Sequence, residues 1–109
     1  MVFDIKNEES EMIPHFKGGE KHFTVKMHDD GINRFLHGVL VLGATIGEHV
    51  HENDCEIMYF LSGRGSVLYD GERLPVEEGQ CHYCPKGHAH SLINDSDGDL
   101  VFFAVVPRQ

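Results

Sequence analysis

Two histidines separated by a single residue, His49 and His51, are followed by Glu56. Alternate residues of a β-strand point to the same face, so both imidazole rings can reach one point. Glu56 has an odd offset from His51 and would leave an unbroken strand on the opposite face. The residues between them, Glu52-Asn53-Asp54, are typical of a turn. We therefore expect the chain to reverse there as a hairpin, so that Glu56 returns on the neighbouring strand, roughly 5 Å away and facing the same interior.

A further histidine, His90, follows a Pro-x-Gly bend and opens another β-favouring run. Imidazole nitrogens and carboxylate oxygens suit first-row divalent metals, which coordinate both kinds of ligand. A His-x-His pair alone is more often surface decoration than a site. Taken together with Glu56 and His90, the pair is interpreted as part of a four-ligand site for one metal ion.

Short β-favouring runs separated by turn residues cover the chain from residue 35 onward. This alternation of short strands and turns is typical of an all-β sandwich or barrel. The Asp70-Gly71 pair predicts a tight hairpin, because both residues tolerate the positive φ angles of a type I′ turn. No helical stripe of ten or more residues is present, and residues 7–12 can form at most one short helix. The expected strands lie at 35–42, 57–61, 65–69, 80–84, 91–94 and 100–106.

The first 20 residues are more polar than those that follow, and we expect them to form an N-terminal arm or edge strand. Such an arm would pair with an exposed sheet edge of its own chain or of a second copy. Residues 21–109 are expected to form one domain, because a chain of 109 residues can bury only one modest core.

Two segments of the sequence resemble the two motifs of the cupin superfamily. The first motif, G-x5-H-x-H-x(3,4)-E-x6-G, is filled by Gly43, His49, His51, Glu56 and Gly63. The second, G-x5-P-x-G-x2-H-x3-N, is filled by Gly79, Pro85, Gly87, His90 and Asn94. The resemblance covers roughly residues 35–107, and all specified positions match at a permitted spacing.

The resemblance implies a jelly-roll β-barrel of two antiparallel sheets with little helix. It also implies one divalent metal ion held by His49, His51, Glu56 and His90, and a homodimer. Fe or Mn is our first choice by analogy with oxygen-using enzymes, and Ni, Zn, Co and Cu stay open. The resemblance does not imply a single reaction, because one fold hosts many functions.

Alternation along the strands also predicts the surroundings of the metal. Met58 and Phe60 share the parity of Glu56, and Leu92 shares that of His90, so we expect these three to line a substrate pocket. His37 and His82 lie in expected strands and are the candidates for acid/base or supporting roles.

Charge and apolar patterning exclude several classes of partner. The 18 acidic residues outnumber the 9 basic ones, which are scattered, so we expect no nucleic-acid partner. The apolar runs are far shorter than the roughly 20 residues of a membrane span, so no membrane partner is expected. Residues 1–20 lack the basic start and apolar stretch of a secretory signal, which predicts a cytoplasmic protein.

We therefore expect a metal-dependent enzyme acting on a small molecule that chelates the ion through two oxygens. Dioxygenase, isomerase, lyase and decarboxylase chemistry all fit this description. The alternative is a non-catalytic binding module for a sugar or metabolite. A further alternative, a sugar-phosphate isomerase or epimerase, is weakened because no Lys/Arg group is concentrated for phosphate.

Overall fold

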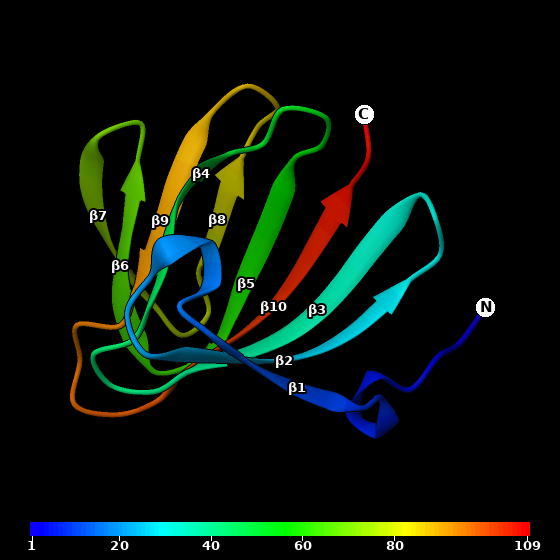
Figure 1. The fold of residues 1–109 in the computed structure, drawn as a ribbon, viewed down its shortest axis with the longest axis horizontal. Helices are drawn as coiled ribbons and strands as arrows, with labels where there is room; N and C mark the ends of the chain where they lie inside the picture. The colour runs from blue at the N-terminus through cyan, green and yellow to red at the C-terminus, as the bar shows by residue number, and fades with distance from the viewer.

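Two antiparallel sheets face each other and enclose the interior of the protein (Figure 1). The structure is a computed structural model that describes residues 1–109. One sheet has six strands in the order β1-β2-β3-β10-β5-β8, and the other has four in the order β4-β9-β6-β7. The strands are β1 (Ser10–Pro14), β2 (His22–Asp29), β3 (Asn33–Leu40), β4 (Thr45–Val50), β5 (Glu56–Ser62), β6 (Arg64–Tyr69), β7 (Glu72–Glu77), β8 (Cys81–Cys84), β9 (Ala89–Ile93) and β10 (Leu100–Pro107).

Strand alternation produces the core. Along β10, every second residue from Leu100 to Val106 is buried while the residues between them are partly exposed. The two helices, η1 (Ile5–Asn7) and η2 (Phe16–Gly18), are single 3-10 turns. The expected all-β jelly roll with little helix is therefore confirmed. No helix of the structure has the length and apolar character that crossing a membrane requires.

The structure has strands at all the runs that the sequence analysis names and adds others. β3, β5, β6, β8, β9 and β10 overlap the six expected runs. β4 carries His49, which the sequence analysis also places on a strand, and β1 lies within the first 20 residues, where an arm or edge strand is expected. β2 and β7 lie outside the named runs. The Asp70-Gly71 hairpin is confirmed: β6 pairs with β7, and the two turn residues have φ angles of 47° and 84°.

The expected hairpin between His51 and Glu56 is wrong in one respect. The chain does turn after His51, but β4 belongs to the four-stranded sheet and β5 to the six-stranded sheet. The turn thus crosses from one sheet to the other. Glu56 therefore approaches the histidines across the interior, rather than from a neighbouring strand hydrogen-bonded to β4 in the same sheet. Spacing alone does not distinguish these cases, because both place the side chains on an inward face.

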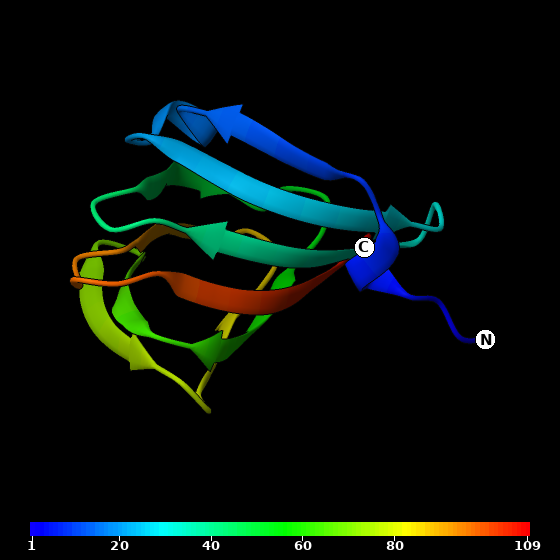
Figure 2. The same ribbon diagram turned by 90° about the horizontal axis from the view of Figure 1, so that it is seen from below.

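The N-terminal segment lies along one margin of the interior (Figure 2). β1 pairs with β2 and forms an edge of the six-stranded sheet. The turn after β1 then packs against β4 of the other sheet. This contact depends on glycines: a Cβ at Gly47 would lie 2.0 Å from the backbone oxygen of Lys17.

Gly38 gives room for the aromatic rings that line the interior. It lies on β3, and a Cβ built there would come within 2.5 Å of Phe102 and 2.6 Å of Phe23. These two rings stack with their centroids 5.7 Å apart and their planes 4° from parallel. The absence of a side chain at residue 38 therefore allows this pair to form.

Candidate metal centre

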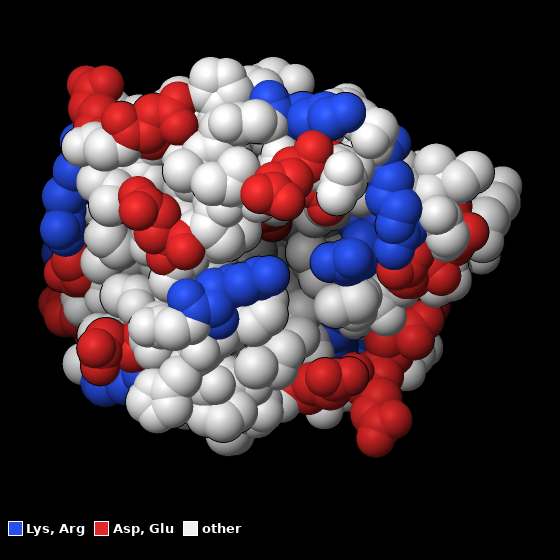
Figure 3. Space-filling view, turned by 45° about the horizontal axis from the view of Figure 1, so that its top comes forward, with Lys and Arg blue, Asp and Glu red and all other residues white.

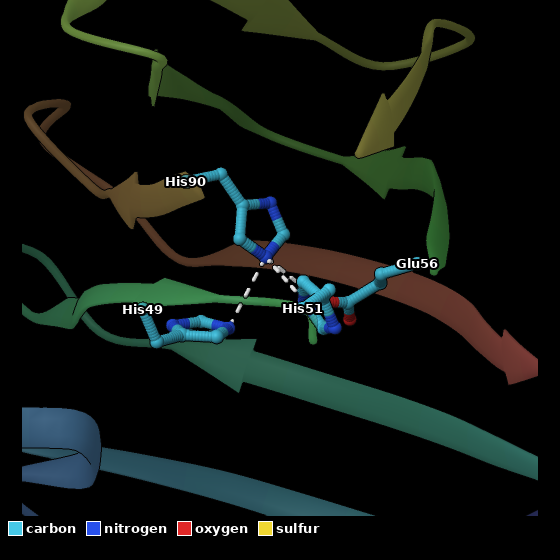
Figure 4. A group of neighbouring side chains, drawn as sticks. All are labelled: His49, His51, Glu56 and His90. Atoms are coloured by element: carbon cyan, nitrogen blue, oxygen red, sulfur yellow. Dashed lines mark hydrogen bonds and ion pairs between the residues drawn. The ribbon is translucent and has the colours of Figure 1, made fainter. Parts of the chain in front are cut away.

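The four predicted ligands come from three strands and one turn, and their side chains point toward one another (Figure 4). His49 lies on β4 directly opposite His90 on β9, in register. His51 follows the end of β4, and Glu56 begins β5. His51, Glu56 and His90 are buried and His49 is half-buried, so the group is largely sheltered from solvent.

The ligand atoms have the spacing of neighbours around one ion. All four lie within 4.8 Å of one another. Nε2 of His90 is 2.9 Å from Nε2 of His51 and 3.2 Å from Nε2 of His49. Oε1 of Glu56 is 3.2 Å from Nε2 of His51 and 3.1 Å from Nε2 of His90. Ligand atoms at right angles around an ion, each about 2.1 Å from it, are about 3 Å apart.

The other nitrogen of each imidazole faces a group that can accept a hydrogen bond. Nδ1 of His49 is 2.8 Å from the carbonyl oxygen of Gly47, and Nδ1 of His51 is 2.6 Å from Oδ1 of Asp54. Nδ1 of His90 is 2.9 Å from Nε2 of His82. A carbonyl or carboxylate oxygen only accepts, so Nδ1 of His49 and of His51 carries the proton.

With Nδ1 protonated, a neutral imidazole presents the lone pair of Nε2. The same tautomer at His90, donating to His82, brings three lone pairs and one carboxylate to a common point. Such a group is electrostatically unfavourable until a cation sits among its members. The donor set therefore fits a single divalent metal ion.

The pKa values of the site agree with this arrangement. In the metal-free protein, burial raises the pKa of Glu56, but hydrogen bonds from Nε2 of His51 and His90 lower it more, to about 2, so the carboxyl is ionised at neutral pH. The Nε2 protons of these two hydrogen bonds have to leave when a metal ion binds. Burial lowers the pKa of His49. Burial also lowers the pKa of His82, to about 4, with the charge of His90 adding to the effect. His82 is therefore neutral at pH 7, and its Nε2 can accept the proton of His90.

His51 differs from the other histidines because of two carboxylates. Burial lowers its pKa, but hydrogen bonds to Glu56 and Asp54 raise it more. His51 thus holds a proton more readily than His49 does in the metal-free protein. This proton has to leave Nε2 when a metal binds there.

A cavity of about 410 Å³ opens beside the four ligands. It is lined by 21 residues, of which 12 are hydrophobic, and all four candidate ligands are among them. The lining also includes two cationic side chains, Lys17 and Arg34. The space-filling view shows a hollow flanked by basic side chains, with acidic ones above it (Figure 3).

The remaining residues singled out in the sequence occupy three different environments. Met58 and Leu92 line the cavity, whereas Phe60 is fully buried in the core and is not part of the lining. His82 is buried behind His90 and contacts it, but does not line the cavity. His37 alternates with buried neighbours on β3, so it lies on the outer face of the six-stranded sheet.

Two contributions to the site are absent from the sequence analysis. Asp54 orients His51, and its position three residues beyond that histidine in a turn is a signal that could have pointed to it. Phe23 and Val25 on β2 line the cavity, and the apolar alternation Phe23, Val25, Met27 is the pattern of a half-buried strand. Lys17 and Arg34 carry no such signal, because only the folded chain brings them to one cavity.

Comparison with known proteins gives both a family and similar structures. The chain is 32% identical over 103 residues to an oxalate-binding protein of Thermotoga maritima, covering 88% of this chain and 84% of the relative. It also resembles a glucose-6-phosphate isomerase of Thermococcus gammatolerans, with 33% identity over 64 residues, 54% of this chain and 34% of that protein.

Among solved structures, a crystal structure from Thermotoga maritima described as a predicted oxalate decarboxylase superposes with a TM-score of 0.93. It is 28% identical, and both chains are covered completely. A polyketide cyclase from Streptomyces resistomycificus shares the fold, with a TM-score of 0.81 at 20% identity over 99% of this chain and 80% of that one. Residues 37–106 match the family described as the Cupin domain, and the chain belongs to this family.

Proposed function

We propose that this protein holds one divalent transition metal ion through His49, His51, Glu56 and His90 and uses it to bind a small molecule through two oxygen atoms. The observation that carries the proposal is the convergence of three Nε2 atoms and one carboxylate oxygen beside an open cavity. Four protein ligands leave two positions of a six-coordinate ion for the small molecule. Oxalate is the simplest such chelator, and the name of the Thermotoga maritima relative supports this choice.

The protein's own residues select the ion and hold the ligands in place. Three nitrogens and one oxygen suit borderline first-row ions, and we propose Fe or Mn ahead of Ni, Zn, Co and Cu. Gly47, Asp54 and His82 each hold one imidazole through its Nδ1 atom. Such contacts fix the ring orientation and raise the basicity of the ligand nitrogen.

Turnover of the bound molecule is the second proposal. A metal ion in this position supplies Lewis acidity, which stabilises negative charge developing on a bound oxygen. Decarboxylation is favoured among the dioxygenase, isomerase, lyase and decarboxylase reactions by the likeness to the Thermotoga maritima structure. The titratable lining residues other than the ligands are Lys17, Arg34, Glu52 and Asp54.

A non-catalytic binding module is supported by the placement of the candidate acid/base groups, His37 and His82. His82 lies behind His90, outside the cavity, and His37 lies on the outer face of the six-stranded sheet. Asp54 does line the cavity, but His51 engages it. A sugar-phosphate isomerase has less support, since the match to the isomerase spans 34% of that protein. Only two cationic side chains line the cavity.

Calorimetry with oxalate tests the metal-dependent binding. We expect saturable binding of oxalate to the manganese-loaded protein and none to the metal-stripped protein. Without the ion, the lining carries three carboxylates against two cations, which repels a dianion. Equal binding with and without metal, or no binding in either state, would overturn the proposal. Release of carbon dioxide or loss of oxalate in the same samples separates turnover from binding.

We also propose that two copies pair through the outer face of the six-stranded sheet. Ile57 and Tyr59 of β5 and Tyr83 of β8 are 43%, 44% and 53% exposed on that face. Ile57 lies opposite Tyr83, and Tyr59 lies opposite Phe103, so the apolar side chains are contiguous across the strands. A contiguous apolar patch of this kind is typical of an interaction surface.

Light scattering at micromolar concentration tests the homodimer. We expect twice the mass of the chain for the wild type and a shift toward the monomer for Tyr59→Glu. Leu42→Glu, at a residue that is 52% exposed outside the two sheets, is the matched control and should stay dimeric. A monomeric wild type would contradict the pairing.

A further inference from the structure

The cavity beside the metal centre is much larger than oxalate. Oxalate has six non-hydrogen atoms and occupies about the space of three water molecules, or about 90 Å³ at roughly 30 Å³ for each water. The cavity measures about 410 Å³. Volumes above about 300 Å³ are typical of pockets that enclose a larger organic ligand. Most of the space thus lies beyond the reach of a bare oxalate held at the metal.

The cavity wall away from the ligands is apolar. Eight of the lining side chains are hydrophobic and at least nine-tenths buried, and they come from both sheets: Phe23, Val25, Leu36, Ile46, Met58, Leu92, Phe102 and Val106. None of them offers a hydrogen bond to a second polar group of a ligand. A polar tail entering this part of the cavity would lose its water without compensation.

The charges of the lining favour a ligand with one negative charge. Lys17, Arg34 and a divalent ion together face the carboxylates of Glu52, Asp54 and Glu56, which leaves one net positive charge. Asp29 lies 3.7 Å from Arg34 and also accepts a paired hydrogen bond from Arg108 at 3.0 and 2.9 Å, so Arg108 balances the charge of this neighbouring carboxylate.

We propose that the ligand is a monocarboxylate with an oxygen on the adjacent carbon, such as a 2-oxo or 2-hydroxy acid, that carries a hydrophobic body. The carboxylate and the adjacent oxygen occupy the two free positions on the metal, and the hydrophobic body packs against the apolar wall. This inference rests on the proposed function, since it assigns the rest of the ligand whose chelating end binds the ion.

A series of unbranched 2-oxo acids tests the inference by calorimetry on the manganese-loaded protein. Pyruvate, 2-oxobutanoate, 2-oxopentanoate and 2-oxohexanoate share one chelating end and differ only in methylene groups. Each methylene that enters apolar surroundings should improve the affinity about fourfold. We expect 2-oxohexanoate to bind about 60-fold more tightly than pyruvate.

A pair of identical substitutions locates the effect. Met27 lines the cavity and is 38% exposed, whereas Met12 is 66% exposed and lies outside it. Met27→Glu places a charge beside the hydrophobic body of the ligand. It should reduce the improvement in affinity for each added methylene at least twofold. Met12→Glu should leave the chain-length dependence intact.

The outcomes separate this inference from the proposed function. If oxalate and pyruvate bind only with metal but affinity stays flat or falls along the series, the hydrophobic body is wrong and the chelation stands. If no acid binds, oxalate included, both are overturned. If affinity rises along the series equally in Met27→Glu and in Met12→Glu, the hydrophobic body does not lie in this cavity.

Discussion

Nε2 of His82 lies 2.9 Å from Nδ1 of His90, so one buried imidazole holds another whose Nε2 belongs to the candidate metal centre. The contact joins β8 of the six-stranded sheet to β9 of the four-stranded sheet. His82 lies opposite Met58 on β5, and Met58 lines the cavity. A single side chain therefore connects the packing of the two sheets to the geometry of the site.

Replacing His82 should weaken metal binding without removing a ligand. His82→Phe keeps an aromatic ring but takes away the acceptor for His90, and losses of such contacts typically cost 10- to 100-fold in metal affinity. We expect about a tenfold loss in a competition titration with a chelating dye. His37→Phe, on the outer sheet face, is the control. Equal affinities in the wild type and His82→Phe would show that the contact does not support the ligand.

The same histidine should make the metal-free protein less stable in mild acid. The folded-state pKa of His82 is about 4, below the ordinary value of 6.5, so the unfolded chain takes up its proton first as the pH falls. The contribution of neutral His82 to the free energy of unfolding is therefore fully present above pH 6.5. It falls by up to about 3 kcal/mol as the pH drops from 6.5 to 4.

Urea unfolding at pH 7.5 and pH 5 measures this effect. The loss of unfolding free energy between the two pH values should be smaller in His82→Phe than in the wild type. His49 contributes in the same direction and His51 in the opposite direction, so the difference between the two proteins isolates His82. An identical pH dependence in both proteins would contradict the buried neutral state of this histidine.

Asp54 should matter for metal binding although it is not a ligand. Asp54→Asn replaces the charged acceptor of His51 Nδ1 by a neutral amide, which weakens the hydrogen bond at 2.6 Å. We expect about a tenfold loss of metal affinity. Asp97→Asn, at an exposed aspartate whose nearest cation is 3.9 Å away, is the matched control and should bind metal normally.

Gly38→Ala should destabilise the fold through the cavity wall. The added methyl group would lie within 2.7 Å of the Phe23 and Phe102 rings, and overpacking of this kind typically costs about 1 to 3 kcal/mol. Gly98→Ala is the control, because nothing lies within 4 Å of a Cβ at that residue. Chemical denaturation of both variants measures the difference, and equal stabilities would mean that the rings move aside without cost.

The sequence predicts the inward-facing ligand residues better than the path of the chain between them. The parity of His49 and His51 and the turn after them follow from local geometry. The separation of β4 and β5 into different sheets does not follow from local geometry, because the choice of partner strand depends on packing across the whole interior. The alternating residues of β2 were readable in the sequence, whereas β4 is interrupted by Gly47 and charged side chains.

The outer parts of the site depend on tertiary structure and were not accessible from spacing. Phe60 has the parity of Glu56 and Met58 but lies farther along β5, where the core encloses it completely. Lys17 and Arg34 come from segments without a shared pattern, and only the folded chain places both in the lining of one cavity. The identity of the metal, the reaction and the cytoplasmic location stay predictions.

Metal stoichiometry tests the central claim most directly. The protein is equilibrated with Mn²⁺ at pH 7.5, freed of unbound ion by gel filtration and analysed for metal, beside a variant that combines Glu56→Gln with His90→Asn. We predict one ion per chain for the wild type and none for the variant. No retained metal in the wild type, or one ion per chain in both proteins, would contradict a metal centre formed by His49, His51, Glu56 and His90.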